Sequence, residues 1–416
     1  MIKLSQKNLL GLTLAIGLAT SHGFAHAEKM TLLTPSSNDM TSQALTTLDG
    51  IALPAINKSK ERVTFSQVLS ADATINTAVN QRFVKESRNF QMEISGAQLN
   101  AGVNIPVASE SAVIRVIPMK NSPQIDSKQL KINANGRWMN HDEAFATAVN
   151  ENQLRAAGLE SPKNTIAVKM KATPSDAGMM MKSEQGLQSG DRFNVIVFEP
   201  NSNEVLKTRL NKSRVVQGET IRVRTRLTKG SKKMAMNNVS AYVMAPNSNV
   251  KIPVELKTRN NVAIAKIDTS KMVASAPGLW EVYISAEAEK GQAKTLRSAK
   301  VGFAVAPMTA RLSGDVDVDL ASADNMAFSF DVENIMAGRY EVSAVIYGTN
   351  ANGDMVPGIM SSTAKWLDAN GTITLDVSKA DLKQAGLSEP LEVRHLKLKD
   401  QTRLSELWSQ DSALKM

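Results

Sequence analysis

The chain contains no cysteine. This absence excludes disulfide bonds, thiol catalysis and lipid attachment at an N-terminal cysteine, and it nearly excludes a zinc site built from cysteine and histidine. Aromatic residues are also scarce, at 4% of the chain. No interleaved aromatic motif accompanies the arginines, which argues against nucleic acid as a ligand. No cofactor is expected, and stability outside the cytoplasm would have to come from hydrophobic cores alone.

Long apolar runs are confined to the first 27 residues. Two lysines precede an apolar run over residues 9–19, and the sequence Ala-His-Ala ends at Ala27. A basic start, a short apolar core and small residues before the cleavage point are typical of a secretory signal peptide. We therefore predict a signal peptide over residues 1–27. The mature protein is expected to be secreted or periplasmic in a Gram-negative cell, with no transmembrane segment after cleavage.

Charge is distributed unevenly along the chain. Residues 28–200 hold 18 basic and 17 acidic side chains, a net charge of +1. Residues 201–307 hold 19 and 7, a net charge of +12, and residues 308–416 hold 10 and 16, a net charge of −6. The predicted mature length of 389 residues (416 − 27) corresponds to two to four domains. A basic segment is therefore followed directly by an acidic one.

The pattern of apolar residues predicts a mainly β, multidomain fold. Residues 28–61 are rich in small polar residues and show little apolar periodicity, which indicates a flexible lead-in. Residues 62–200 contain short apolar runs and predict a β-rich N-terminal domain with one or two helices. Residues 201–307 and 308–416 show short alternating runs separated by turn residues, which are typical of β-sandwiches.

The clearest helical pattern lies at residues 140–158. Asn140 can cap the helix, and Asp142 and Glu143 suit its positive first turn. Phe145 begins the apolar side, and glycine and proline follow the last turn. The spacing predicts one helix over this stretch.

Three stretches of the C-terminal half carry a resemblance to a known family: PGLWEVYISAEAEKGQAKTLRSAKVGFAVAP, AGRYEVSAVIYGTNANGDMVPG and EPLEVRHLKLKDQTRL. They resemble an uncharacterised family of secreted Gram-negative proteins with tandem immunoglobulin-like domains. The function of these domains is unknown. The resemblance implies that residues 201–307 and 308–416 form two immunoglobulin-like sandwiches, one basic and one acidic. It also implies export, and it brings no catalytic residues to transfer.

The basic segment contains a candidate anion-binding site. Arg222, Arg224 and Arg226 occupy alternate positions of one predicted strand, so they project from one face about 7 Å apart. A lysine-rich turn follows, with Lys229, Lys232 and Lys233. Such a patch suits sulfate, phosphate or carboxylate groups on lipopolysaccharide or other anionic glycans. The simpler alternative is a solvated sheet face that keeps the protein soluble.

The acidic segment opens with GDVDVDL, which places Asp315, Asp317 and Asp319 at every second position. This spacing predicts a strand whose intervening apolar residues are buried. Calcium is an alternative because it needs only oxygen ligands, but no nearby segment completes a ligand set. Because the arginines have the same spacing, the three aspartates are candidates for docking between domains, within a chain or between chains.

A second acidic loop, GTNANGDMVPG, partly matches a calcium-binding loop. It offers oxygen ligands at Asn350, Asn352 and Asp354 but lacks the first aspartate and the closing glutamate of such a site. A simple turn is therefore favoured. No metal site is predicted.

Only two histidines, His141 and His395, lie outside the predicted signal peptide. Neither is accompanied by a G-x-S-x-G or H-E-x-x-H motif. The start of a helix accounts for His141 with Asp142 and Glu143, and a position in a strand accounts for His395. We predict no catalytic site, although a hydrolase built around these residues stays an alternative.

The sequence therefore favours an exported, non-enzymatic binding or interaction protein that recognises anionic surfaces or glycans through its basic sandwich. The expected partners are an anionic glycan, lipopolysaccharide or another secreted protein. Two alternatives stay open. One is a secreted hydrolase, and the other is an accessory or inhibitory module of a secreted enzyme, a role that sandwich domains can fill without chemistry of their own.

Overall fold

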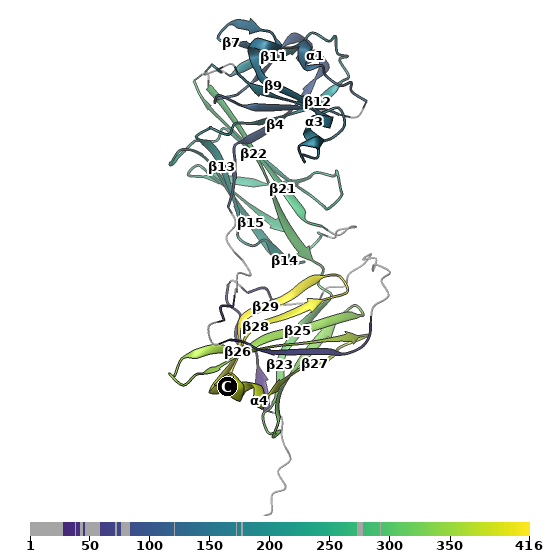
Figure 1. The fold of residues 1–416 in the computed structure, drawn as a ribbon, viewed down its shortest axis with the longest axis vertical. Coiled ribbons are helices and arrows are strands. Elements are labelled where there is room, and N and C mark those ends of the chain that lie inside the picture. The colour runs from purple at the N-terminus through teal and green to yellow at the C-terminus, as the bar shows by residue number, and fades with distance from the viewer. Residues whose placement is uncertain are drawn as a thin grey trace, which may run out of the picture.

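The computed structural model describes residues 28–37, 39–41, 45, 59–70, 73–75, 84–119, 121–171, 173–175, 178–272, 278–291 and 293–416. These residues form three β-rich bodies stacked along one long axis (Figure 1). Most regular structure is strand and the α-helices are short, so the predicted mainly β, multidomain sandwich fold is confirmed. Within the described residues, no helix has the length and apolarity needed to cross a membrane. The predicted signal peptide lies outside them.

The N-terminal body consists of two packed sheets. The first has the strand order β4-β12-β6-β10-β9: Asn89–Ser95, Arg192–Phe198, Val113–Pro118, Ile166–Met170 and Phe145–Asn150. The second has the order β5-β11-β7-β8: Val103–Ile105, Met179–Ser183, Leu130–Ala134 and Arg137–Met139. The short helices are α1 (Gly96–Ala101), α2 (His141–Ala144), α3 (Glu151–Ala156) and the 3-10 helix η1 (Ser127–Gln129). Alternate residues such as Ile114 and Val116 are buried between the sheets, as the period of two dictates.

The prediction of one helix over residues 140–158 is wrong, because a strand replaces the middle of the predicted helix. The strand β9 separates α2 from α3 and pairs with β10. Each short helix begins with its own capping box, at Asn140 and at Asn150. The stretch between the two boxes contains the β-branched residues Thr147 and Val149, which suit an edge strand. The second capping box marks a new helix start that the apolar pattern alone conceals.

The middle body is a sandwich of two sheets. One has the order β19-β20-β15-β13-β3: Leu256–Arg259, Val262–Asp268, Thr220–Lys229, Glu204–Leu210 and Val84–Ser87, with β16 (Lys232–Lys233) also paired to β15. The other has the order β14-β22-β21-β17-β18: Arg214–Val216, Ala293–Ala306, Trp280–Lys290, Asn238–Met244 and Ile252–Val254. Trp280, Val282 and Ile284 are buried between them. β3 also joins this sheet, although it precedes the whole N-terminal body in the sequence.

The C-terminal body is a second sandwich. One sheet has the order β1-β23-β24-β27: Glu28–Thr31, Ala310–Asp319, Asn325–Asn334 and Gly371–Ser378. The other has the order β2-β26-β25-β28-β29: Val63–Val68, Met355–Leu367, Gly338–Thr349, Ser388–Asp400 and Ser405–Lys415. One short helix, α4 (Lys379–Gln384), follows β27. The core contains the fully buried side chains of Phe328, Phe330 and Tyr340.

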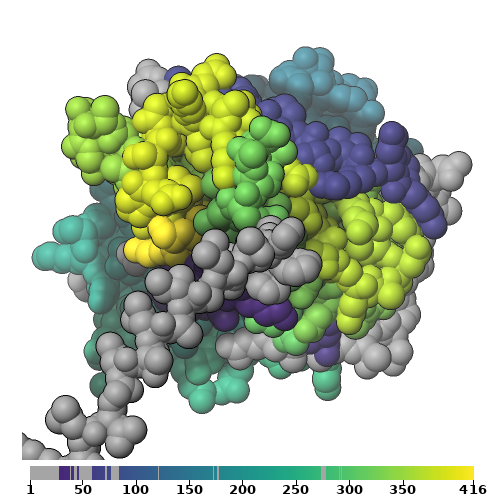
Figure 2. All heavy atoms as spheres, turned by 90° about the horizontal axis from the view of Figure 1, so that it is seen from below, coloured from purple at the N-terminus to yellow at the C-terminus, as the bar shows by residue number. Residues whose placement is uncertain are grey.

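The N-terminal arm, which we define as the described residues between 28 and 70, belongs to the C-terminal body. β1 pairs with β23 and β2 pairs with β26. Figure 2 shows the indigo segment around β2 against the yellow-green C-terminal body. Met30 packs against the C-terminal core, and backbone hydrogen bonds join Met40 to Ser409 in both directions.

Two sequence-based boundaries are corrected by this arrangement. The described part of residues 28–61 is not a flexible lead-in, and the N-terminal body does not begin at residue 62, because β2 lies on the C-terminal sheet and β3 on the middle one. The physical reason is that a short strand is stable only when it pairs in a sheet, and the partners of β1, β2 and β3 lie far along the chain. A local composition signal cannot reveal those partners.

His395 has an unusual backbone conformation within the C-terminal sheet. Its φ is 54° at an irregularity of β28, in the left-handed region that non-glycine residues rarely adopt. Nδ1 lies 2.7 Å from Oδ1 of Asp411, and Nε2 lies 3.0 Å from the hydroxyl of Tyr347. Burial lowers the pKa of His395, while the charge of Asp411 opposes that shift. The ring therefore links three strands mainly as a neutral group.

This environment predicts a loss of stability on mild acidification. Because the pKa of His395 is lower in the folded state than in the unfolded state, its contribution is complete above about pH 6.5 and is lost as the pH falls through the folded-state pKa. Replacing His395→Asn keeps a side chain that tolerates positive φ and removes the titration. Urea unfolding between about pH 7.5 and pH 5.5 should therefore show a smaller loss for H395N than for the native chain.

His141→Asn provides the control, since His141 lies at a helix start in the N-terminal body. Its unfolding is measured over the same pH range. Equal losses for the native chain and H395N would contradict the assignment.

Candidate anion-binding surface

The three predicted arginines lie on the exposed face of one strand. In β15, Arg222, Arg224 and Arg226 are exposed, while Ile221 and Val223, on the opposite face, are fully buried. The alternation of β-branched or apolar residues with arginine produces this arrangement, because successive side chains of a strand point to opposite faces. The strand thus supplies a straight row of three guanidinium groups.

The register of the neighbouring strands extends this row into two dimensions. Arg226 lies opposite Lys207 and Arg224 opposite Arg209, both on β13. On the other side, Arg222 lies opposite Lys266 of β20. The edge strand β19 adds two more basic residues whose register positions share this face. We define the basic sheet face by these eight residues: Lys207, Arg209, Arg222, Arg224, Arg226, Lys257, Arg259 and Lys266.

Few acidic groups accompany these cations. Glu86 of β3 lies 2.6 Å from Lys207 Nζ, and this hydrogen bond lowers the pKa of Glu86. Asp268 lies at the rim, where the backbone N–H of Ser270 lowers its pKa. Among the described residues, no carboxylate lies within ion-pair distance of the β15 arginines. Glu255 lies 4.0 Å from Lys257 Nζ. The face therefore carries a net positive charge that is concentrated at the arginines of β15.

The three predicted lysines lie beyond the end of the arginine row. Lys229 ends β15, and Lys232 and Lys233 form the short paired strand β16. Lys229 Nζ donates a hydrogen bond of 3.0 Å to Oε1 of Glu204, so this lysine already has an anionic partner. Lys232 and Lys233 are exposed. The six predicted residues therefore form two groups. The three arginines have no carboxylate within ion-pair distance among the described residues, whereas one of the three lysines, Lys229, pairs with Glu204.

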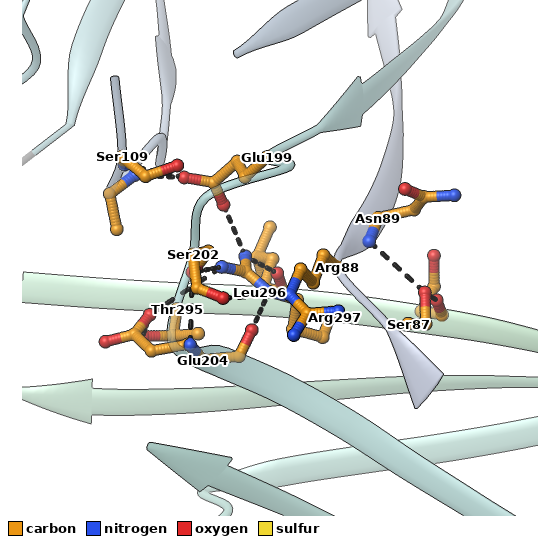
Figure 3. Close-up of polar contacts among 12 residues, drawn as sticks. Ser87, Arg88, Asn89, Ser109, Glu199, Ser202, Glu204, Thr295, Leu296 and Arg297 are labelled. Atoms are coloured by element: carbon orange, nitrogen blue, oxygen red, sulfur yellow. Dashed lines mark hydrogen bonds and ion pairs between the residues drawn. The ribbon is translucent and has the colours of Figure 1, made fainter. Parts of the chain in front are cut away.

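A buried ionic network at the junction with the N-terminal body holds the start of β13 (Figure 3). Arg297 of β22 and Glu199 are fully buried, and Arg297 Nη1 lies 2.6 Å from Oε2 of Glu199. Arg297 Nε donates to the backbone carbonyl of Glu204 at 2.8 Å, and Nη2 donates to the Ser202 hydroxyl at 2.8 Å. Burial lowers the pKa of Arg297, and the charges of Glu199 and Glu204 oppose that shift.

The same network reaches the N-terminal body. Glu199 Oε1 accepts the backbone N–H groups of Ala108 and Ser109, at 2.6 and 2.8 Å. Arg88, which comes directly after β3, donates from Nε to the backbone carbonyl of Ser202 at 2.9 Å. β13, which carries Lys207 and Arg209 of the basic sheet face, and its neighbour β3 therefore meet the N-terminal body at one hydrogen-bonded point. Sequence reasoning missed this network because Arg297 occupies an alternating polar position that resembles a surface residue.

The three predicted aspartates lie on β23 of the C-terminal body. Asp317 is opposite Lys29 of β1, and Val316 and Val318 are buried in the core, as predicted for a strand. Within the described residues, no hydrogen bond or ion pair joins Asp315, Asp317 or Asp319 to the arginines of β15. The chain thus does not bring the two rows together, and docking between chains stays a prediction.

The calcium alternatives gain no geometric support. Among the residues that the structure describes, no group of three or more histidine and carboxylate side chains is placed to hold a metal ion. Asn350 Oδ1 instead accepts the backbone N–H groups of Asn352 and Asp354, both at 2.9 Å. These bonds are those of a turn closed by an asparagine side chain.

The residues considered for a hydrolase serve local structure. Glu143 accepts the Asn140 backbone N–H at 3.3 Å and pairs with Arg137. His141 Nδ1 lies 2.9 Å from Oδ1 of its neighbour Asp142. His395 lies in another body. The two histidines are therefore not brought together.

Comparison with known proteins gives family matches for the N-terminal and C-terminal parts of the chain. The model of the N-terminal domain of DUF4785, a domain of unknown function, matches residues 54–199, and that of its C-terminal domain matches residues 309–416. A crystal structure of a DUF4785 family protein from Legionella pneumophila is similar, with a TM-score of 0.67, 19% identity, and coverage of 90% of this chain and 99% of that chain.

Other solved structures are only distantly similar. The α2-macroglobulin of Escherichia coli gives a TM-score of 0.19 at 11% identity, over 70% of this chain and 21% of that chain. Bovine butyrophilin gives 0.20 at 10% identity, over 49% and 93%. Curated proteins gave no match.

The buried network predicts a large cost for removing its cation. Arg297→Ala would leave the fully buried Glu199 without its counter-charge, whereas Glu204 would keep Lys229, and the substitution should lower the free energy of unfolding by about 3–5 kcal/mol. Lys300→Ala, on the same strand, breaks an exposed pair with Glu281 and should cost at most about 1 kcal/mol. Urea denaturation of both variants tests the difference, and equal losses would show that the junction is not dry.

Proposed function

The chain belongs to the DUF4785 family, and from this premise we propose that it is an exported, non-enzymatic binding protein that recognises anionic surfaces or glycans through the basic sheet face. The predicted signal peptide supports export. The fold shared with the Legionella protein shows architecture alone, so the function rests on the surface itself.

One observation carries the proposal: the arginine row of β15 is exposed and has no carboxylate partner within ion-pair distance among the described residues. Exposed cations that are already paired gain little from a new anion, whereas unpaired guanidinium groups are free to form bidentate contacts. The row lies on a sheet, so its spacing is set by the backbone rather than by flexible loops.

The surrounding charges favour the approach of an anion. Eight cations share the face with three carboxylates, Glu86, Glu255 and Asp268, and the whole middle segment carries a net charge of +12 (19 basic and 7 acidic residues). A concentration of one charge sign attracts ligands of the opposite sign and accelerates their association. Groups such as sulfate, phosphate or carboxylate, repeated along a glycan or across a surface, fit this pattern.

Removing the arginine row should weaken binding to a polyanion. The variant with Arg222→Gln, Arg224→Gln and Arg226→Gln should bind heparin at least about tenfold more weakly, because three contacts of roughly 0.5–1 kcal/mol each are lost. Affinity for heparin should also fall between about 50 and about 500 mM salt, since exposed charges are screened. Heparin-column elution and titration calorimetry measure both effects.

A matched control changes three lysines of the N-terminal body. Lys163→Gln, Lys169→Gln and Lys171→Gln alter the net charge by the same amount at exposed positions outside the face. This variant should elute close to the native chain. Equal weakening by both triple variants would replace a defined site with a general effect of net charge.

A further inference from the structure

The basic sheet face also carries apolar side chains. Val84 of β3 is 46% exposed and lies opposite Arg209, and Ile264 of β20 is half-buried and lies opposite Arg224. Val262, also half-buried, lies opposite Arg259 of β19. Each of these aliphatic groups is thus a direct cross-strand neighbour of an arginine.

The cations spread in two directions. From β13 to β19 the face spans three strand spacings, about 14 Å, and from Arg222 to Arg226 it extends about 13 Å along β15. One cross-strand row contains both kinds of side chain: Lys257, Ile264, Arg224, Arg209 and Val84 follow one another across the sheet. An unbranched polyanion can follow one line of charges at a time. An array of separate headgroups can meet all of them together.

We propose that the ligand of this face is a lipid surface whose headgroups carry phosphate, an inference that rests on the proposed function and names its ligand class. Arginine matches phosphate with two parallel hydrogen bonds, so the β15 row would hold the headgroups. The aliphatic side chains beside the arginines would contact apolar parts of the lipids that the arginines hold.

The charge term predicts a large effect of the arginine row. Each Lys or Arg near an anionic leaflet adds favourable binding free energy. Three such residues together change partitioning to vesicles by about 100-fold. The full chain should therefore cosediment with vesicles of phosphatidylglycerol and phosphatidylcholine in equal parts but not with phosphatidylcholine alone. The variant R222Q, R224Q, R226Q should lose about 100-fold in vesicle partitioning, and the lysine control of the N-terminal body should keep it.

The aliphatic groups separate a lipid ligand from a soluble polyanion. Val84→Thr with Ile264→Thr preserves β-branched side chains, and therefore strand preference, while removing apolar contact. This variant should lose about tenfold in partitioning to the mixed vesicles, because buried apolar surface is lost. Its elution from heparin should not change. Circular dichroism and thermal unfolding of the variant confirm that it is folded.

The outcomes distinguish the two proposals. Heparin binding without vesicle binding would overturn the lipid inference and leave the proposed function intact. Vesicle binding that the double variant V84T, I264T does not weaken would also overturn the lipid inference and leave the proposed function intact, because charge alone would then explain the binding. Binding to neither probe would overturn both.

Discussion

Arg297 holds a positive charge inside a junction from which water is excluded, between Glu199 on one side and Glu204 on the other. A buried charge is tolerated only when its partners are close and their remaining lone pairs are satisfied. Here the backbone N–H groups of Ala108 and Ser109 donate to Glu199, and the Thr295 hydroxyl donates to Glu204. The Ser202 hydroxyl accepts a hydrogen bond from Arg297. Three segments that are distant in sequence must therefore arrive together, so the orientation of the N-terminal body to the middle body is specified by one network.

The basic sheet face depends on this junction. β13 begins at Glu204, and β3 ends one residue before Arg88, which also binds the junction. The strand that carries Lys207 and Arg209, β13, and its neighbour β3 are thus anchored to a rigid point at one end of the face. Recognition by spaced charges requires such rigidity, because mobile cations lose conformational freedom on binding. Hydrophobic packing in the middle core then fixes β15 beside them.

Periodicity in the sequence was enough to predict which face of a strand is buried, but not which strands pair or in what register. Alternation in β15 and β23 identified their exposed and buried faces, because side-chain direction in a strand is local. It could not place Lys207 beside Arg226, since pairing between strands is decided by the whole sandwich. The predicted helix failed at β9 for the same reason: pairing with β10 outweighed a helical pattern of moderate length. Arg297 was invisible because its burial is created by other segments.

The N-terminal arm has a consequence for biosynthesis. A ribosome makes β1 and β2 first, yet their partner strands β23 and β26 lie in the last third of the chain. Until those strands emerge, Met30, Val63 and Phe65 have no sheet to join, and the arm is a pair of unpaired strands of the kind that aggregates. The C-terminal body likewise keeps two open edges until the arm returns. The arm and the C-terminal body therefore close the chain into one large loop when β1 pairs with β23 and β2 pairs with β26.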